Sequence, residues 1–202
     1  MKKISSMLVI TSICLLQACS DNKTESVDTT KDSTTVSGAD TTSHMDTSTN
    51  QASMADQPMF DQDTKNFVMK AADGGMMEVE LGKIAQEKSK NPRVKNYADM
   101  IVADHTQAND DLKSTVGSRA TLPATMSAEH QKHVAMMKNK SGTDFDKSYI
   151  SMMIDDHKTD IAEFKKASAN LKDASIKGFA NDKLPVLQKH LDSAQAIHGS
   201  KM

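Results

Sequence analysis

Tryptophan is absent from this 202-residue chain, and aromatic residues make up only 3% of it. That scarcity argues against an aromatic-rich surface of the kind that binds carbohydrates. Positive charge is also not concentrated: the formal net charge is −2, and no strong basic patch points to nucleic acid as a partner. Serine triads, phosphate-binding glycine loops and nucleotide-binding fingerprints are missing too. An enzyme is therefore the less favoured class.

Cysteine is nearly absent as well, and both copies, Cys14 and Cys19, lie close to the N-terminus. A basic start and a short apolar run precede Cys19, which is typical of an export signal and too short for a membrane anchor. The segment Leu16–Cys19 resembles the lipobox of bacterial lipoproteins, where the signal is cut before the cysteine and the thiol receives lipid. We predict a signal peptide over residues 1–18 and a lipid on Cys19, which leaves the mature domain without a thiol or a disulfide. An ordinary secretory signal cleaved nearby is the alternative.

The predicted location follows from this signal. Ser20, directly after the lipidated cysteine, is similar to an outer-membrane sorting signal. The resemblance implies an outer-membrane lipoprotein that faces the periplasm or the cell surface. Its membrane contact is then the N-terminal lipid, and its protein partners are not indicated.

Large apolar residues are almost missing from residues 19–58, which are rich in Ser, Thr and Asp. Such a segment buries too little surface to offset its ordering entropy, so we predict a disordered tether between lipid and domain. Two alternatives remain open. Triplets that begin at Asp28, Asp32 and Asp40 resemble a bacterial O-glycosylation signal. Scattered soft ligands for copper form another set: His44, Met45, Met54 and Met59.

Strand-like alternation is absent from residues 59–199, where apolar residues recur three and four positions apart. Proline, glycine and capping residues divide this region into four long helices and one short extra helix. We predict their bounds at about Asp61–Ser89, Pro92–Val116 and Ser127–Met137, with further helices from Thr143 and from Asp173. Thr143-x-x-Asp146 is close to a capping box and is predicted to open the fourth helix. Gly75, Glu78 and Gly82 share one helical face, so we expect a neighbouring helix to approach there. Methionine pairs at helical spacing are predicted to fill the core.

The most informative sequence pattern in the chain occurs twice. Tyr97 and His105 recur as Tyr149 and His157, at a constant offset of 52 residues (97 to 149 and 105 to 157). Each copy places a histidine in the middle of an apolar helical stripe. Buried imidazoles need partners, and metals are common ones. The repeat therefore suggests a pseudo-symmetric bundle with a polar site inside.

Several further motifs follow one another along the chain. They are Glu78–Ala85, Asn91–Lys95, Asp104-His105, Asp144–Tyr149, Asp156-His157 and Leu184–Leu191. Together they resemble a bacterial family of envelope proteins of unknown function, often described as outer-membrane proteins, whose fold is a ferritin-like helical bundle. The resemblance covers about Phe60 to His198. It implies an all-α, ferritin-like four-helix bundle with one short extra helix, and it implies no activity, because the family has no settled one.

Four side chains are predicted to project inward from four different helices: Glu78, His105, His157 and His190. Facing helices of a bundle can bring such groups together to bind one divalent transition metal, zinc, iron or copper. Asp104 and Asp156 precede the two repeated histidines and are predicted to accept imidazole N–H groups or to serve as ligands. Metal sequestration or stress protection would suit such a site. The alternative is a non-catalytic structural or interaction module, in which a buried histidine–carboxylate network holds the helices together without metal.

The sequence gives weaker support to three other kinds of metal site. Di-iron bundles use Glu-x-x-His, and the residues three positions before the histidines are Val102, Ile154 and Leu187. That absence argues against carboxylate-bridged iron and oxidase chemistry. His130 and His133 could bind metal at the surface, although exposed histidine pairs are usually solvated. Met153, four residues before His157, could contribute to a copper site.

Overall fold

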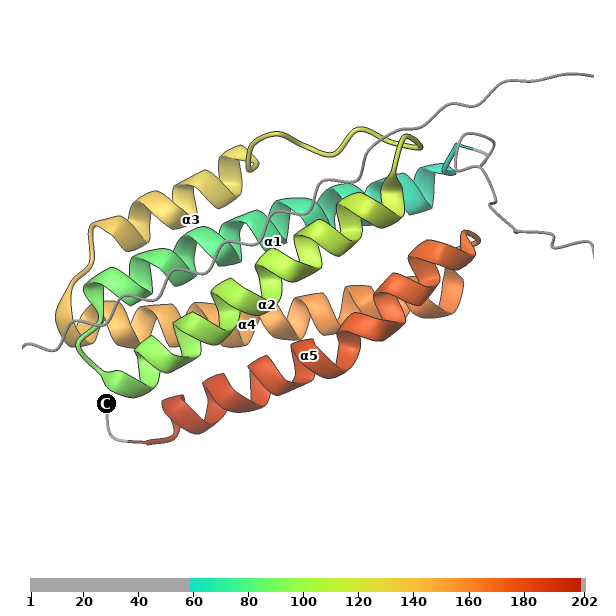
Figure 1. Ribbon diagram of the computed structural model, residues 1–202. Helices are drawn as coiled ribbons and strands as arrows, with labels where there is room; N and C mark the ends of the chain where they lie inside the picture. Colours follow the sequence, from blue (N-terminus) through green and yellow to red (C-terminus); the bar gives the residue numbers. More distant parts are fainter. Residues whose placement is uncertain (1–58, 201–202) are drawn as a thin grey trace, which may run out of the picture. The chain divides into compact units, whose positions relative to one another are not determined.

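The computed structural model describes residues 59–200 (Figure 1). The helices in this region are α1 (Gln62–Lys88), α2 (Pro92–Val116), α3 (Ala128–Lys138), α4 (Gly142–Asn170) and α5 (Ala174–His198). Regular structure within these residues is entirely helical, which confirms the all-α prediction and the four long helices with one short one. The predicted signal peptide, the lipidated cysteine and the tether over residues 19–58 lie outside the described residues. No helix between residues 59 and 200 combines the length and apolar character needed to cross a membrane.

Polar side chains cap four of the five helices at their N-termini. Each accepts a hydrogen bond from a backbone N–H of the first turn, as N-cap residues do. The pairs are Asp61 with Thr64, Asn91 with Arg93, Ser127 with His130, and Asp173 with Ile176. Pro92 is the first residue of α2, where its missing N–H costs nothing. These boundaries are the ones that the sequence predicts.

The start of α4 differs from the prediction of a capping box over Thr143–Asp146. Ser141 occupies the N-cap position and makes no side-chain capping bond. Gly142 has a φ of +56°, a left-handed conformation that glycine adopts without strain, and it turns the chain from α3 into α4. Because α4 already begins at Gly142, Thr143 lies inside its first turn, and Asp146, which is buried, lies one turn too late to form a capping box.

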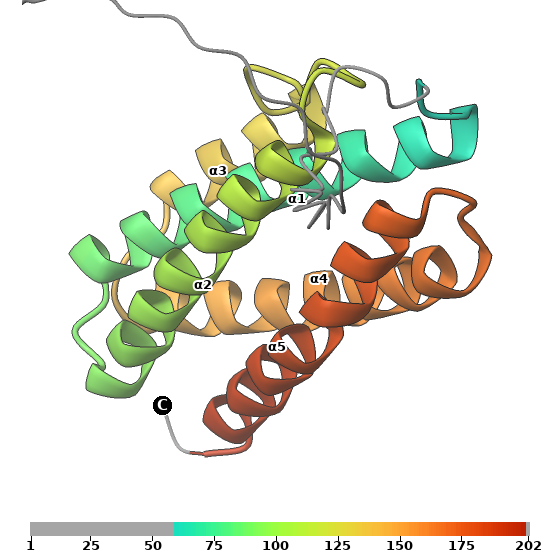
Figure 2. The same cartoon turned by 45° about the vertical axis from the view of Figure 1, so that its right-hand side comes forward.

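The four long helices form an antiparallel bundle (Figures 1 and 2). Helix α1 packs against α2 and α4, and α5 packs against α4 and α2. Helix α3 lies outside, on α1 and α4, and returns the chain so that α4 runs in the same direction as α2. The two copies of the sequence repeat therefore lie on parallel helices that are diagonal to each other across the core.

Two glycines let α1 and α2 approach closely, as the sequence predicts. A Cβ atom on Gly82 would lie 2.7 Å from Val102 Cγ2, far shorter than a van der Waals contact. A Cβ atom on Gly75 would overlap the side chain of Asn109. A Cβ atom on Gly74 would meet nothing within 4 Å, so that glycine plays no part in the approach.

The core is organised in layers that follow from the repeat. Diagonal, parallel helices place equivalent residues opposite each other, so Tyr97 faces Tyr149 with ring centroids 6.0 Å apart. Two turns further along, His105 faces His157 at 5.5 Å. A phenylalanine layer follows, in which Phe164 lies 5.0 Å from Phe67. The histidines thus lie between two aromatic layers.

Methionines fill the core, as predicted, at Met77, Met137 and Met153. Met136 differs from the prediction and is 46% exposed, because its neighbour Met137 takes the inward-facing position on α3.

Candidate metal centre

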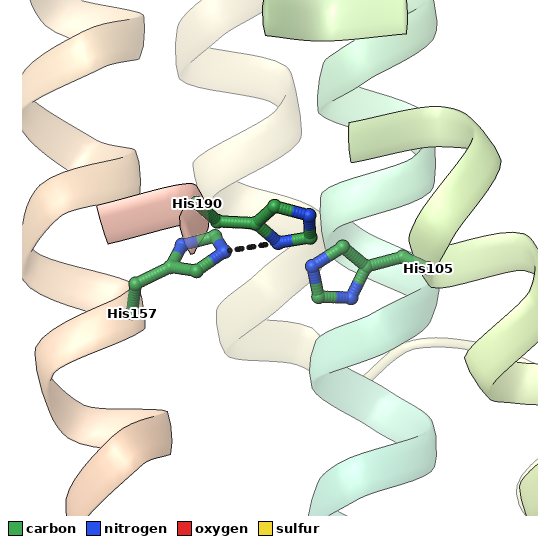
Figure 3. A group of neighbouring side chains, drawn as sticks. All are labelled: His105, His157 and His190. Carbon is green, nitrogen blue, oxygen red and sulfur yellow. Dashed lines mark hydrogen bonds between the residues drawn. The ribbon is translucent and has the colours of Figure 1, made fainter. Parts of the chain in front are cut away.

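Three histidines from three helices meet in the middle layer (Figure 3). His105 comes from α2, His157 from α4 and His190 from α5, and all three side chains are buried. One ring nitrogen from each lies within 4.8 Å of the others. Across residues 59–200, no other set of three His, Cys, Asp or Glu side chains converges in this way. The spacing of these residues along apolar stripes therefore places all three rings at one level of the bundle.

The outward-facing nitrogen of each ring contacts an oxygen acceptor. His157 Nδ1 lies 2.9 Å from the Met153 carbonyl oxygen. His190 Nε2 lies 2.8 Å from Asp104 Oδ2, and His105 Nδ1 lies 2.8 Å from Glu78 Oε2. A carbonyl or an ionised carboxylate only accepts. With Glu78 ionised, as it is above its raised pKa of about 7, each of these nitrogens is therefore assigned the ring hydrogen. This assignment leaves the second nitrogen of each neutral ring with a lone pair.

The three remaining nitrogens point at one another. His157 Nε2 and His190 Nδ1 are 3.1 Å apart, and Figure 3 shows a nitrogen of His105 directed toward the same space. His105 Nε2 has no hydrogen-bond partner among the described residues. Lone pairs that face one another at hydrogen-bond distance repel unless a positive charge lies between them. The cluster therefore needs either a shared proton or a metal cation.

Burial disfavours protonation of the three histidines. It lowers the pKa of His105, His157 and His190 from 6.5 to about 4 in each case. Nearby carboxylates oppose this effect, Glu78 for His157 and Asp104 for His190, without overcoming it. At neutral pH the cluster is therefore three neutral imidazoles, the form in which histidine binds metals.

Glu78 joins the cluster, but on the outer side of the rings. Its second oxygen, Oε1, lies 3.5 Å from His157 Nδ1, too long for a good hydrogen bond. Burial raises the pKa of Glu78 to about 7, although the charge of His157 works in the opposite direction. The carboxyl group therefore faces the ring hydrogens of two histidines rather than their lone pairs.

The two predicted supporting aspartates have different positions. Asp104 contacts His190 on α5, not the adjacent His105, because neighbouring residues of a helix point about 100° apart. Asp156 lines a surface groove with His133, and its Oδ2 atom has no hydrogen-bond partner among residues 59–200. Burial raises the pKa of Asp156, and the charges of His133 and His130 offset part of that rise. The structure does not join Asp156 to the three histidines.

The other predicted metal pair stays outside the cluster. His130 and His133 lie on α3 with ring centroids 6.1 Å apart, and His130 Nδ1 lies 3.1 Å from Asp73 Oδ2. No third ligand converges on them within the described region.

Comparison with known proteins assigns the domain. The model of the family described as domain of unknown function (DUF4142) matches residues 49–197. The chain belongs to the DUF4142 family. No curated protein matches it.

Two solved structures resemble this DUF4142 chain in fold. The crystal structure of a DUF305 fragment from Deinococcus radiodurans has a TM-score of 0.62 at 14% identity, covering 70% of this chain and 99% of that one. CopM in the Cu(II)-bound form has a TM-score of 0.56 at 15% identity, covering 67% of this chain and 95% of that one. At such low identity these likenesses show the helical-bundle fold alone. The family match confirms the predicted family of unknown function, and the two structures confirm the helical bundle. The ferritin-like label stays a prediction.

The sequence analysis did not identify two polar residues that lie near the three histidines. Asn109 and Asp160 line a cavity beside Glu78 and His105. Burial raises the pKa of Asp160 well above its usual value, and the charges of Glu78 and Asp156 add to the rise. The available signal was their spacing, since Asn109 and Asp160 lie four and three residues after the repeated histidines.

Proposed function

We propose that this protein binds one transition metal ion through His105 Nε2, His157 Nε2 and His190 Nδ1. The main support for this proposal is the direction in which the six ring nitrogens of these histidines point. Three lone pairs meet inside the bundle, while all three ring hydrogens have acceptors in Glu78, Asp104 and the Met153 carbonyl. Acceptors of this kind fix the orientation and tautomer of histidines that ligate metals.

Distances support this proposal. Nitrogens bound tetrahedrally at about 2.0–2.1 Å from a zinc ion are about 3.3 Å apart. His157 Nε2 and His190 Nδ1 already meet that spacing at 3.1 Å. One nitrogen of each ring lies within 4.8 Å of the others, so a side-chain adjustment of about 1.5 Å brings such a set to tetrahedral spacing.

The donor set favours a borderline ion, and copper, zinc and iron are the candidates. Copper is the first to test, because one structural neighbour is described as Cu(II)-bound. Glu78, predicted from the sequence as a fourth ligand, is proposed here to hold His105 through its ring hydrogen. The role that we propose is non-catalytic sequestration of the ion or protection against metal stress.

The location remains part of the proposal. A lipid on Cys19 would hold the domain at the outer membrane, on the periplasmic or outer face, and Leu16–Cys19 is the supporting sequence. Loss of labelled palmitate incorporation in Cys19→Ser, with retention in Cys14→Ser, is the expected result. Equal labelling of both variants would contradict lipidation of Cys19.

Metal content tests the site directly. The protein, purified without a histidine tag or chelator, is expected to hold about one equivalent of a transition metal by mass spectrometry. His105→Ala/His157→Ala should lose it, while His130→Ala, which changes a histidine outside the cluster, should keep it. Asp104→Asn should weaken affinity by about 10–100-fold, and Asp155→Asn, at an exposed neighbouring position of the repeat helix, serves as its control.

The competing function predicts another outcome. Asp104, His190, His157 and the Met153 carbonyl already form a continuous chain of polar contacts, which could hold the helices without metal. A folded protein that takes up no copper, zinc or iron would establish this structural network and exclude the metal proposal.

A further inference from the structure

A groove of about 1000 Å³ lies on the surface of the bundle, where residues of α3, α4 and the C-terminal end of α5 meet. Its wall includes two methionines, Met136 of α3 and Met152 of α4, together with His133 and Asp156. None of the three clustered histidines lines this groove. It is therefore a candidate binding site separate from the metal centre.

Helical spacing places the four side chains as two pairs. His133 and Met136 are three residues apart on α3, so they share one face of that helix. Met152 and Asp156 are four apart on α4 and share a face in the same way. Helix α3 packs against α4, and both pairs line the same groove. Burial raises the pKa of Asp156 and the charge of His133 is the largest opposing influence, so these two groups lie near each other.

Two donor atoms of this set are buried and lack a partner. His133 Nδ1 and Asp156 Oδ2 have no hydrogen-bond partner among residues 59–200. Such atoms are uncommon in native proteins, and a bound ion or water commonly satisfies them. Within the same range, no third His, Cys, Asp or Glu completes a set with them. The remaining soft donors at the groove are the thioether sulfurs of Met136 and Met152.

Both methionines are placed where a ligand can reach them. Met136 is 46% exposed, and Met152 is partly exposed at the edge of the core. Unbranched, flexible side chains of this kind can turn toward a ligand. Thioether sulfurs are soft donors that select Cu(I), and imidazole is also a good copper ligand. Two lysines and two aspartates line the groove, so its charge favours neither anions nor hard cations.

We propose that this groove binds one Cu(I) ion through the sulfurs of Met136 and Met152 and the imidazole of His133, with Asp156 supplying an oxygen donor or a counter-charge. The site needs no ion at the three histidines, so it goes beyond the proposed function. It gives the protein a second metal site, at the surface, whose thioether donors favour the reduced ion. The buried centre, in contrast, offers nitrogen donors alone.

The test uses the full chain, isotope-labelled at its methionine methyl groups and titrated with Ag(I). This ion shares the charge, the filled d shell and the soft character of Cu(I), and it is stable in air. Methyl signals are followed by NMR and assigned with Met→Leu variants, which change the side-chain volume little. Met69 is the internal control, because it is 40% exposed on α1 and lies outside the groove.

The methyl signals of Met136 and Met152 should move together as Ag(I) is added, while that of Met69 stays in place. In Met136→Leu and in His133→Gln, the Met152 methyl then reports the remaining affinity. We expect this affinity to fall at least about tenfold in both variants, because each loses one donor, and to be unchanged in Met69→Leu. Substitution of the exposed Met136 should leave the fold intact.

Three results would overturn the proposal. Methyl signals of Met136 and Met152 that ignore Ag(I) would show that the groove holds no soft metal. Equal movement of the Met69 signal would show indiscriminate binding to exposed thioethers. A Met152 response that is unchanged in both Met136→Leu and His133→Gln would show that these side chains are not ligands. None of these readouts depends on the three clustered histidines, so a failure here leaves the proposed function standing.

Discussion

At the scale of single residues, burial of three imidazoles at one level makes stability depend on pH. The pKa of each histidine falls to about 4 in the folded protein, from an ordinary value of 6.5. As pH drops below 6.5, the unfolded chain binds protons that the folded chain does not. These groups therefore lower the free energy of unfolding between about pH 6.5 and 4, and have no further effect below that range.

Carboxyl groups nearby act in the opposite sense. The raised pKa of Glu78, about 7, means that the folded chain binds a proton first and gains stability as pH falls through 7. Asp156 and Asp160, whose pKa values are also raised, contribute in the same direction. The total pH dependence of the wild type therefore mixes two opposed effects, and a histidine variant is needed to separate them.

We expect His105→Asn to isolate the histidine contribution. In metal-free protein, the wild type should lose on the order of 2 kcal/mol relative to the variant between pH 7.5 and 4.5, because the variant lacks one depressed pKa. Urea unfolding at several pH values, with a chelator present, measures this difference. A difference that stays constant with pH would contradict the burial of a neutral imidazole at position 105.

At the histidine site, the sequence could predict which residues face inward but not how their side chains are oriented or paired. The repeat identified His105 and His157, because an apolar stripe on each side fixes which way a helical residue faces. The choice between Nδ1 and Nε2 follows from side-chain rotation, which no spacing encodes. The pairing of Asp104 with His190 joins residues 86 positions apart. Because Asp104 is adjacent to His105 in the sequence, the sequence suggested His105 as its partner. The packing of α2 against α5 instead brings Asp104 to His190.

At the scale of helices, close approach of α1 to α2 positions Glu78 beside His105. We expect Gly82→Ala to destabilise the fold by about 1–2 kcal/mol, since its Cβ atom would overlap Val102 and overpacking exceeds the gain in helix propensity. Gly74→Ala should instead stabilise by about 0.5–1 kcal/mol, because open space surrounds that Cβ atom. Thermal or urea unfolding of the two variants gives the comparison. Equal effects from both changes would mean that the helix contact does not depend on glycine at position 82.

Helix boundaries were predictable because local chemistry sets them. Asp61, Ser127 and Asp173 cap their helices through their own side chains. The exception at α4 shows where such reasoning ends. Asp146 has the spacing of a capping residue after Thr143, but α4 already begins at Gly142. A cap motif read from sequence does not by itself fix the residue at which the helix begins.

At the scale of the whole domain, a metal ion would join α2, α4 and α5 at their centre. Binding at a free-ion concentration of about 100 times Kd adds about 2.7 kcal/mol to the free energy of unfolding. For a domain of this size we expect Tm to rise by about 10 °C. Differential scanning calorimetry with and without Cu(II) or Zn(II) measures the change. His157→Gln should show no such rise, and a wild type whose Tm ignores both ions would favour the structural network.

The arrangement of the whole bundle was only partly accessible from sequence. The period of apolar residues indicated helices, and the repeat indicated two equivalent ones. The position of α3 was not encoded in that pattern, and it is α3 that allows α2 and α4 to run in the same direction. Their diagonal relation, which makes His105 face His157, is a property of the path of the chain.

The tyrosine layer gives the protein an optical reporter of its own. Tyr97 and Tyr149 are the two tyrosines of the chain, and no tryptophan masks their emission. They lie eight residues from His105 and His157, about 12 Å along the helices. Cu(II) at the histidines would quench this fluorescence over such a distance, whereas Zn(II), with its filled d shell, would not. Tyrosine emission could then follow copper arriving at the centre, and its replacement by zinc, in unlabelled protein.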